Sequence, residues 1–255
     1  MTQLKAALVL LSLVLIPSCS SAPRVQHTGE LTVAAAADLT SAFEEIGREF
    51  QSSTNTKVIF NFGSSGLLAK QIENGAPIDL FAAANVDYIN QLEQKGLIVP
   101  DTKKVYARGR LIIWTLKDSP LGIEKLADLT KPDVKRIAIA NPEHAPYGMA
   151  ARQALERAGL WESVKPKLVF GENVRQTLQY AQTGNVEVAI VALSLGGQSD
   201  GHWILVPEEL HNPLDQALGV IKGAGNEAAA RAFADFIVGE HGQAIMKRYG
   251  FTTPQ

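Results

Sequence analysis

The sequence has little cysteine, no excess of charge of either sign and no apolar run of membrane-spanning length. Its single cysteine excludes a disulfide within the chain, and 24 basic against 26 acidic residues exclude the basic surface of a nucleic-acid-binding protein. The longest apolar run, residues 6–16, is shorter than the ~20 residues of a membrane helix. Because the five histidines lack metal-ligand spacing, we expect no directly coordinated metal and no cofactor.

The N-terminal segment predicts export. The apolar run follows Lys5 and has the length of a signal-peptide core, ~7–15 residues. It ends in IPSC, residues 16–19, which resembles a bacterial lipobox with Cys19 as the lipidated residue. Cleavage after Ala22 is the alternative, but a lone thiol in an exported protein otherwise has no partner. We therefore expect a signal peptide at 1–19 and a tether at 20–29. The exported protein is expected in the periplasm or at the extracytoplasmic face of the membrane, where a lipid on Cys19 would anchor it.

Strand-like and helix-like patterns alternate along the remaining chain. The expected strands are 31–36, 58–62, 78–82, 111–116, 136–140, 167–170, 186–193 and 218–221. The expected helices are 39–50, 67–73, 86–95, 149–158, 174–183, 227–237 and 242–248. This alternation predicts a parallel α/β architecture built from two similar halves.

Four strand-to-helix junctions have the features of an anion site. They lie at Asp38-Leu39, Ser65-Gly66, Tyr147-Gly148 and Asn173-Val174. A helix start exposes unpaired N–H groups and the positive end of the helix dipole. Since doubly wound sheets bind ligands at the carboxyl ends of their strands, two facing halves would bring all four junctions to one cleft. The pattern favours a site for one small oxyanion.

Several of these segments resemble the ModA family of periplasmic molybdate-binding proteins. The matching segments are VAAAADLT (33–40), FGSSGLLAKQIENGAPIDLF (62–81), NPEHAPYG (141–148), GENVR (171–175) and KRYGF (247–251). The resemblance implies a two-lobed periplasmic-binding-protein fold, each lobe a mostly parallel sheet flanked by helices, with the ligand cleft between the lobes. It implies lobe 1 at 30–106 plus 208–255 and lobe 2 at 107–207.

The resemblance also implies a function. The protein is expected to be a monomer that captures molybdate, with tungstate left open, and delivers it to the membrane permease of an ABC importer. Its membrane contact would be the lipid on Cys19. The expected ligand contacts are the main chain of Ala37 and Asp38, the Ser65 hydroxyl, Tyr147, and the main-chain amide of Val174.

Two positions need a physical explanation, one outside the matching segments and one within them. Ala192 occupies the place where one branch of the family carries a binding tyrosine, so we expect the Tyr147 hydroxyl to supply that donor. An Asp38 carboxylate aimed at a dianion would repel it. We therefore expect the Asp38 side chain to cap the following helix, with Ser41 as the alternative cap.

A shell made only of donors suits molybdate, which has no proton at neutral pH. Monohydrogen phosphate keeps a proton, and leaving that proton unpaired in a dry site costs ~1–3 kcal/mol. Sulfate has the same charge and shape as molybdate, so a site for another oxyanion such as sulfate is the alternative function.

A serine hydrolase is the alternative from another class of protein. The glycines flanking Ser64 and Ser65 are too close for a Gly-x-Ser-x-Gly elbow, and no histidine or acid is visibly coupled to either serine. We expect Ser64 to belong to the turn and His144 to lie at the surface without a role. We therefore expect no enzymatic activity.

Overall fold

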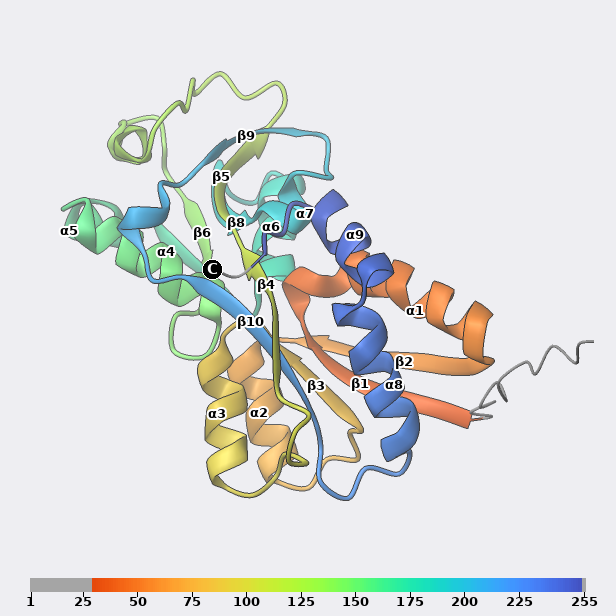
Figure 1. Cartoon of the computed structure of the whole chain (residues 1–255). Helices are drawn as coiled ribbons and strands as arrows, with labels where there is room; N and C mark the ends of the chain where they lie inside the picture. The colour runs from red at the N-terminus through yellow and green to blue at the C-terminus, as the bar shows by residue number, and fades with distance from the viewer. Residues whose placement is uncertain (1–28, 254–255) are drawn as a thin grey trace, which may run out of the picture.

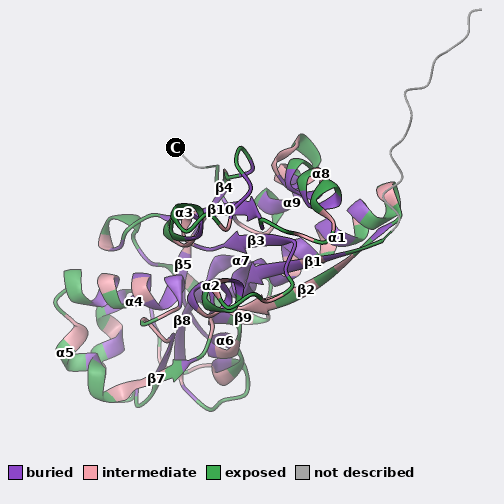
Figure 2. Ribbon diagram, turned by 90° about the horizontal axis from the view of Figure 1, so that it is seen from below, coloured by how far each residue is buried: buried purple, intermediate pink, exposed green. Residues whose placement is uncertain are grey.

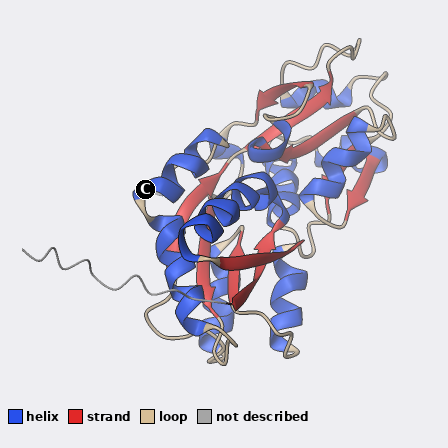
Figure 3. Ribbon diagram, turned by 90° about the vertical axis from the view of Figure 1, so that its right-hand side faces the viewer, coloured by secondary structure: helices blue, strands red, loops and turns tan. Residues whose placement is uncertain are grey.

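The computed structural model describes residues 29–253, and the predicted signal peptide, lipobox and nearly all of the tether lie outside this range. The described chain forms two sheets, each flanked by helices (Figure 1, Figure 3). The first sheet has the strand order β2 (Thr56–Gly63), β1 (Gly29–Ala36), β3 (Leu80–Ala83), β10 (Leu214–Val220) and β4 (Lys104–Gly109). The second has the order β7 (Leu168–Gly171), β6 (Ile137–Ala140), β8 (Val188–Ala192), β5 (Leu111–Leu116) and β9 (Gly201–Leu205). We call the layers around these sheets lobe 1 and lobe 2.

The helices divide between the lobes in the same way. Lobe 1 carries α1 (Thr40–Thr54), α2 (Ser65–Glu73), α3 (Val86–Gln94), α8 (Glu227–Val238) and α9 (Glu240–Arg248). Lobe 2 carries α4 (Pro146–Arg157), α5 (Trp161–Val164), α6 (Val174–Gln182) and α7 (Leu193–Gly196). Short 3-10 turns are η1 (Ala37–Leu39), η2 (Leu126–Thr130), η3 (Lys165–Lys167) and η4 (Glu208–Leu210). The last two helices pack near α1, so the end of the chain completes lobe 1 (Figure 1).

The two sheets are mixed, which refines the expectation of mostly parallel sheets. In lobe 1, β1 pairs in parallel with β2 and β3, whereas β10 runs antiparallel to β3 and β4. In lobe 2, β6 pairs in parallel with β7 and β8, whereas β5 runs antiparallel to β8 and β9. The chain passes between the lobes from β4 to β5 and again from β9 to β10. The antiparallel pairs therefore involve the strands next to the two crossovers.

The core explains why the apolar runs become strands. The central strands of both sheets are buried, and the exposed residues lie on the edge strands, the outer faces of the helices and the loops (Figure 2). Val33 and Ile139, at the centres of β1 and β6, are fully buried, and so is Trp114 of β5. Strands covered on both faces by helices read as continuous apolar runs, as observed here.

Most expected elements are confirmed, and their ends follow local signals. The α2 helix ends at Glu73, and Gly75 adopts the left-handed conformation with φ of +83°, as the Asn74-Gly75 pair predicts. The Asn173 side chain caps α6 by accepting the amides of Arg175 and Gln176. Strands β4 and β9 were absent from the expected set. Within residues 29–253, no helix has the length and apolarity needed to cross a membrane.

Candidate functional site

The four predicted junctions meet between the lobes. They enclose a cavity of about 10 Å³ whose walls come from both lobes. The residues that line it are Ala36, Ala37, Asp38, Gly63, Ser64, Ser65, Ala84, Ala145, Pro146, Tyr147, Asn173 and Val174. All five residues expected to contact the ligand are among them. Because this volume holds about one water molecule, the lobes must part before a larger anion can enter.

Each junction places a helix start at the cavity. Ser65 and Val174 are the first residues of α2 and α6, and Tyr147 is the second residue of α4. Asp38 lies in the η1 turn that follows β1. Among residues 29–253, the amides of Ser65, Tyr147 and Val174 have no backbone acceptor, whereas the Asp38 amide bonds its own carboxyl. These donors come from both lobes, so an anion held by all of them would connect the lobes.

The Ser65 hydroxyl is oriented to donate. Ser65 is fully buried, and its Oγ accepts the amide of Ala84 over 3.0 Å. A hydroxyl has one proton, and this bond uses a lone pair and leaves the proton available. Ser65 can therefore add a side-chain donor to the backbone amides of the shell.

The Asp38 side chain does not cap a helix, so that prediction is wrong, and Ser41 does not replace it. No side chain caps α1, and the Asp38 carboxylate instead accepts the Nε2 amide of Gln216 through Oδ2. Gln216 lies on β10 at an irregularity in its pairing with β4, and such bulges often redirect a side chain. Long-range packing, which leaves no signal near Asp38 in the sequence, prevails over local capping.

The Tyr147 hydroxyl lies beside this Asp38–Gln216 pair. The hydroxyl oxygen accepts a hydrogen bond from Gln216 Nε2 over 3.5 Å, and the hydroxyl is hydrogen-bonded to the Asp38 carboxyl. A side chain at Gly109 would come within 2.1 Å of it, so the glycine makes room for the ring. The expectation that this hydroxyl replaces a donor missing at Ala192 stays a prediction, and in this structure the partners of the hydroxyl are Gln216 and Asp38.

The buried groups around Asp38 have altered acidities. Burial raises the pKa of the Asp38 carboxyl to about 6, although hydrogen bonds from Gln216 and Tyr147 oppose this rise. Burial, and then the nearby Asp38 carboxyl, raise the pKa values of the Tyr106 and Tyr147 hydroxyls well above their usual range. Both tyrosines therefore stay neutral near pH 7.

His144 and Ser64 connect the lobes at the edge of the cavity, contrary to expectation. The His144 carbonyl, in lobe 2, accepts the amide of Gly66 over 2.9 Å and the hydroxyl of Ser64 over 2.5 Å. The Tyr88 hydroxyl approaches the same oxygen at 3.4 Å. In the opposite direction, Ser194 of α7 donates to the carbonyl of Asp38 over 2.8 Å. The structure is therefore a closed form in which these contacts hold the lobes together.

The contact between Ser64 and the His144 ring is a coupling that the sequence did not reveal. Ser64 Oγ lies 2.8 Å from His144 Nδ1. Because its single proton is donated to the His144 carbonyl, the ring nitrogen acts as donor to Oγ and not as a base. Burial lowers the pKa of His144, so the ring is neutral at pH 7. This geometry serves lobe closure and does not activate a nucleophile.

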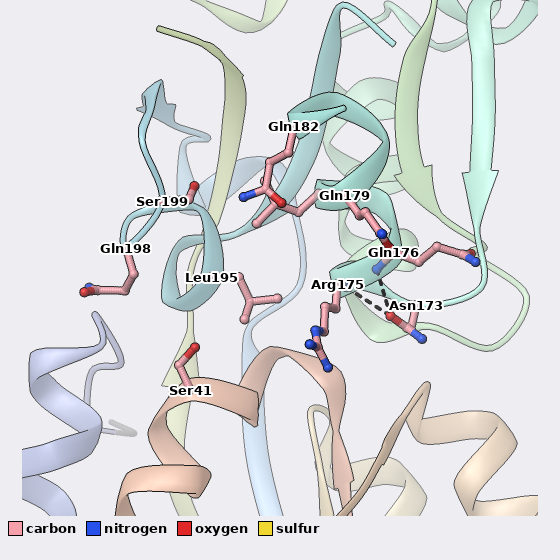
Figure 4. A pocket seen from close by; sticks show the side chains of 10 residues that line it. Ser41, Asn173, Arg175, Gln176, Gln179, Gln182, Leu195, Gln198 and Ser199 are labelled. Atoms are coloured by element: carbon pink, nitrogen blue, oxygen red, sulfur yellow. Dashed lines mark hydrogen bonds between the residues drawn. The ribbon is translucent and has the colours of Figure 1, made fainter. Parts of the chain in front are cut away.

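A larger and more open groove, about 600 Å³, lies beside the closed cavity (Figure 4). It lies between α1 of lobe 1 and α6 and α7 of lobe 2, and Asn173 borders both spaces. Its polar side chains include Gln176, Gln179 and Arg175, and Arg175 extends toward Ser41 of α1. Asp38, Ser65, Tyr147 and Val174 line the smaller cavity and not this groove, so the smaller cavity is the better candidate site. Within residues 29–253, no cluster of three or more potential metal ligands occurs.

Comparison with known proteins agrees with this geometry. Residues 31–252 match the family described as bacterial extracellular solute-binding proteins. The chain is 36% identical over 229 residues to the molybdate-binding protein ModA of Azotobacter vinelandii, covering 88% of this chain and 90% of the relative. It is 34% identical to that of Rhodobacter capsulatus over 88% and 89%, and 29% identical to the Bacillus subtilis protein named putative ABC transporter substrate-binding lipoprotein YvgL over 95% of each chain.

Solved structures give the same result. The Azotobacter vinelandii periplasmic molybdate-binding protein superposes with a TM-score of 0.84 at 28% identity, covering 88% of this chain and all of the other. The sulfate-binding protein SubI of Mycobacterium tuberculosis shares the fold, with a TM-score of 0.76 at 16% identity over 89% and 87% of the two chains. The chain therefore belongs to the family of bacterial extracellular solute-binding proteins.

Proposed function

We propose that this protein captures molybdate between its two lobes and delivers it to the membrane permease of an ABC importer. The observation that supports this proposal is the convergence of four helix starts, three of them with free amides, and of the Ser65 hydroxyl on one closed cavity. The relatives named molybdate-binding protein indicate which oxyanion it is. Tungstate, with the same charge and shape, is the expected second ligand.

The shell recognises charge with neutral donors. The ligand contacts are the amides of Ala37, Asp38, Tyr147 and Val174, and the amide and hydroxyl of Ser65. Each helix start stabilises an anion by ~0.3–1 kcal/mol, and by more when it is partly buried. No lysine or arginine is among the residues that line the cavity. An open, unliganded form therefore leaves no full cation buried without a partner.

Isothermal titration calorimetry with molybdate tests this function. Replacing Ser65 with alanine removes a donor to a charged group, which contributes ~1.5–3 kcal/mol, so the affinity should fall about 10- to 150-fold. Ser53→Ala is the matched control, because Ser53 is an exposed helix serine whose hydroxyl bonds only its own helix at Phe50. Equal affinity in Ser65→Ala and the wild type would contradict the proposed shell.

The proposed function also includes a monomeric state, the two lobes and a lipid anchor. The protein acts as a monomeric binding protein and not as an enzyme, and its first lobe boundary lies after Gly109, three residues later than expected, because β4 belongs to the sheet of lobe 1. Export leaves it anchored through lipidated Cys19, a proposal supported by the lipobox-like segment and by the relative named a lipoprotein. Incorporation of labelled palmitate that is lost in Cys19→Ser tests the anchor, and labelling that persists in the variant would refute it.

A further inference from the structure

The Asp38 carboxyl is enclosed with the proposed anion site but has no cationic partner. Asp38 is 1% exposed, and its Oδ1 has no hydrogen-bond partner among the described residues. The groups that lie around the carboxyl are the side-chain amide of Gln216, the hydroxyls of Tyr147 and Tyr106, and the backbone amide of Asp38 itself. All of these groups are neutral near pH 7, so an ionised Asp38 would keep its full charge inside the closed lobes.

No cation is among the groups that shift the pKa of Asp38, and the groups that β10, α4 and β4 direct at the carboxyl are Gln216, Tyr147 and Tyr106. The η1 turn contacts α1, α6, α7 and β2. Around it, Thr40 of α1 and Ser194 of α7 contribute hydroxyls that bond backbone carbonyls, and Gly63 of β2 has no side chain. The nearest charged side chain on α6 is Arg175, which is exposed, lines the separate groove and forms no ion pair with Asp38 (Figure 4).

Closing the lobes on a dianion would therefore place two negative groups in one small cavity. The Asp38 amide and carboxyl belong to the same residue, so an anion held by that amide lies near the carboxyl. An unpaired carboxylate in such a site is strongly disfavoured, and like charges in a dry site favour protonation. Burial already raises the pKa of Asp38 to about 6, and a neighbouring dianion would raise it further.

We propose that Asp38 couples anion capture to proton uptake, so that one proton enters the closed site with each dianion. This inference rests on the proposed anion-binding function. The proton comes from solvent when the lobes close, binds a carboxyl oxygen of Asp38 and returns to solvent when the lobes open. The neutral carboxyl adds an O–H donor to a site that otherwise presents donors to the ligand.

Calorimetric titration of molybdate between pH 5.5 and 8.5, in two buffers of different ionisation enthalpy, counts the protons. The wild type should take up one proton per anion at pH 7–8, and its affinity should weaken about tenfold per pH unit there. Asp38→Asn mimics the neutral carboxyl, so it should take up no proton and bind with little pH dependence. His144 also titrates, and the variant separates its effect from that of Asp38.

Asp79→Asn is the matched control. Asp79 is also a buried carboxylate, 8% exposed, but it accepts the amides of Thr32 and Asn226 outside the site. It should retain the pH slope of the wild type. Molybdate binding by the wild type without proton uptake, or a full pH slope in Asp38→Asn, would overturn the coupling and leave the proposed function intact. A wild type that binds no oxyanion at any pH would overturn both. If Asp38→Asn does not fold, the proton count of the wild type decides alone.

Discussion

Alanine in place of Gly66 adds one methyl group between the lobes, outside the residues that line the anion cavity. Gly66 is the second residue of α2, and its amide donates to the His144 carbonyl of lobe 2 over 2.9 Å. A Cβ atom there would lie 2.7 Å from that carbonyl oxygen and 2.9 Å from the Tyr88 hydroxyl. Tyr88 can rotate away, but the carbonyl is backbone, so the closed form must loosen.

The expected cost can be estimated from this overlap. Forcing an extra methyl group into a packed contact costs ~1–3 kcal/mol. The cost falls on the closed form, so the affinity for molybdate should drop about 5- to 150-fold. Alanine is favoured over glycine inside a helix by ~0.8–1.0 kcal/mol. The unliganded, open Gly66→Ala protein should therefore be at least as stable as the wild type while binding more weakly.

Isothermal titration calorimetry measures the affinity, and thermal unfolding without anion measures the stability. Gly225→Ala is the matched control, because its added Cβ would make only an ordinary contact, 3.7 Å from Asp79 Oδ1, away from the lobe interface. Its affinity should equal that of the wild type. If Gly66→Ala bound molybdate as tightly as the wild type, the contact with His144 would not belong to the ligand-bound form.

Three further predictions concern single side chains. The pKa of Asp38 rises from its ordinary 3.8 to about 6, so the wild type loses about 2 kcal/mol of stability between pH 4 and pH 7. Asp38→Asn lacks this loss, so urea unfolding should find it more stable than the wild type at pH 7 but not at pH 4, and equal differences at both pH values would refute the assignment. Ser64→Ala removes a bond across the lobes worth ~1 kcal/mol, so the dissociation rate in stopped flow should rise several-fold, whereas an unchanged rate would contradict its closing role. Arg175→Ala removes an exposed cation from the groove beside the cavity, so anion association should slow at low salt but not at high salt, and a salt-independent loss would indicate direct contact instead.

The helix starts around the site could be predicted because each one depends on local sequence. The Gly-Ser turn before α2 and the Asn173 cap of α6 each fix a junction within a few residues. The convergence of the junctions follows from the carboxyl-end rule for α/β sheets, and their residues line one cavity.

The contacts across the lobes could not be predicted in the same way. Gln216 reaches Asp38 across 178 residues of sequence, and the His144 carbonyl acquires its donors only when the lobes close. Neither contact leaves a periodicity or a motif. Local propensity favoured Asp38 as a cap, and tertiary packing prevailed. The short strands β4 and β9 were missed because each is stabilised mainly by its neighbour in the sheet, β10 and β5 respectively.

Thermal unfolding against a panel of oxyanions tests most directly the claim that a shell of neutral donors selects a tetrahedral dianion without a proton. At a hundredfold excess over Kd, bound molybdate should stabilise the protein by ~2.7 kcal/mol. For a chain of this size, that gain corresponds to an increase in Tm of about 5–11 °C. Molybdate and tungstate should give this shift, whereas sulfate and phosphate at pH 8 should each give a smaller one, phosphate because its proton costs ~1–3 kcal/mol. An increase in Tm with phosphate or sulfate equal to that with molybdate would contradict the claimed selectivity of the donor shell. No increase with any of the four oxyanions would contradict anion binding itself.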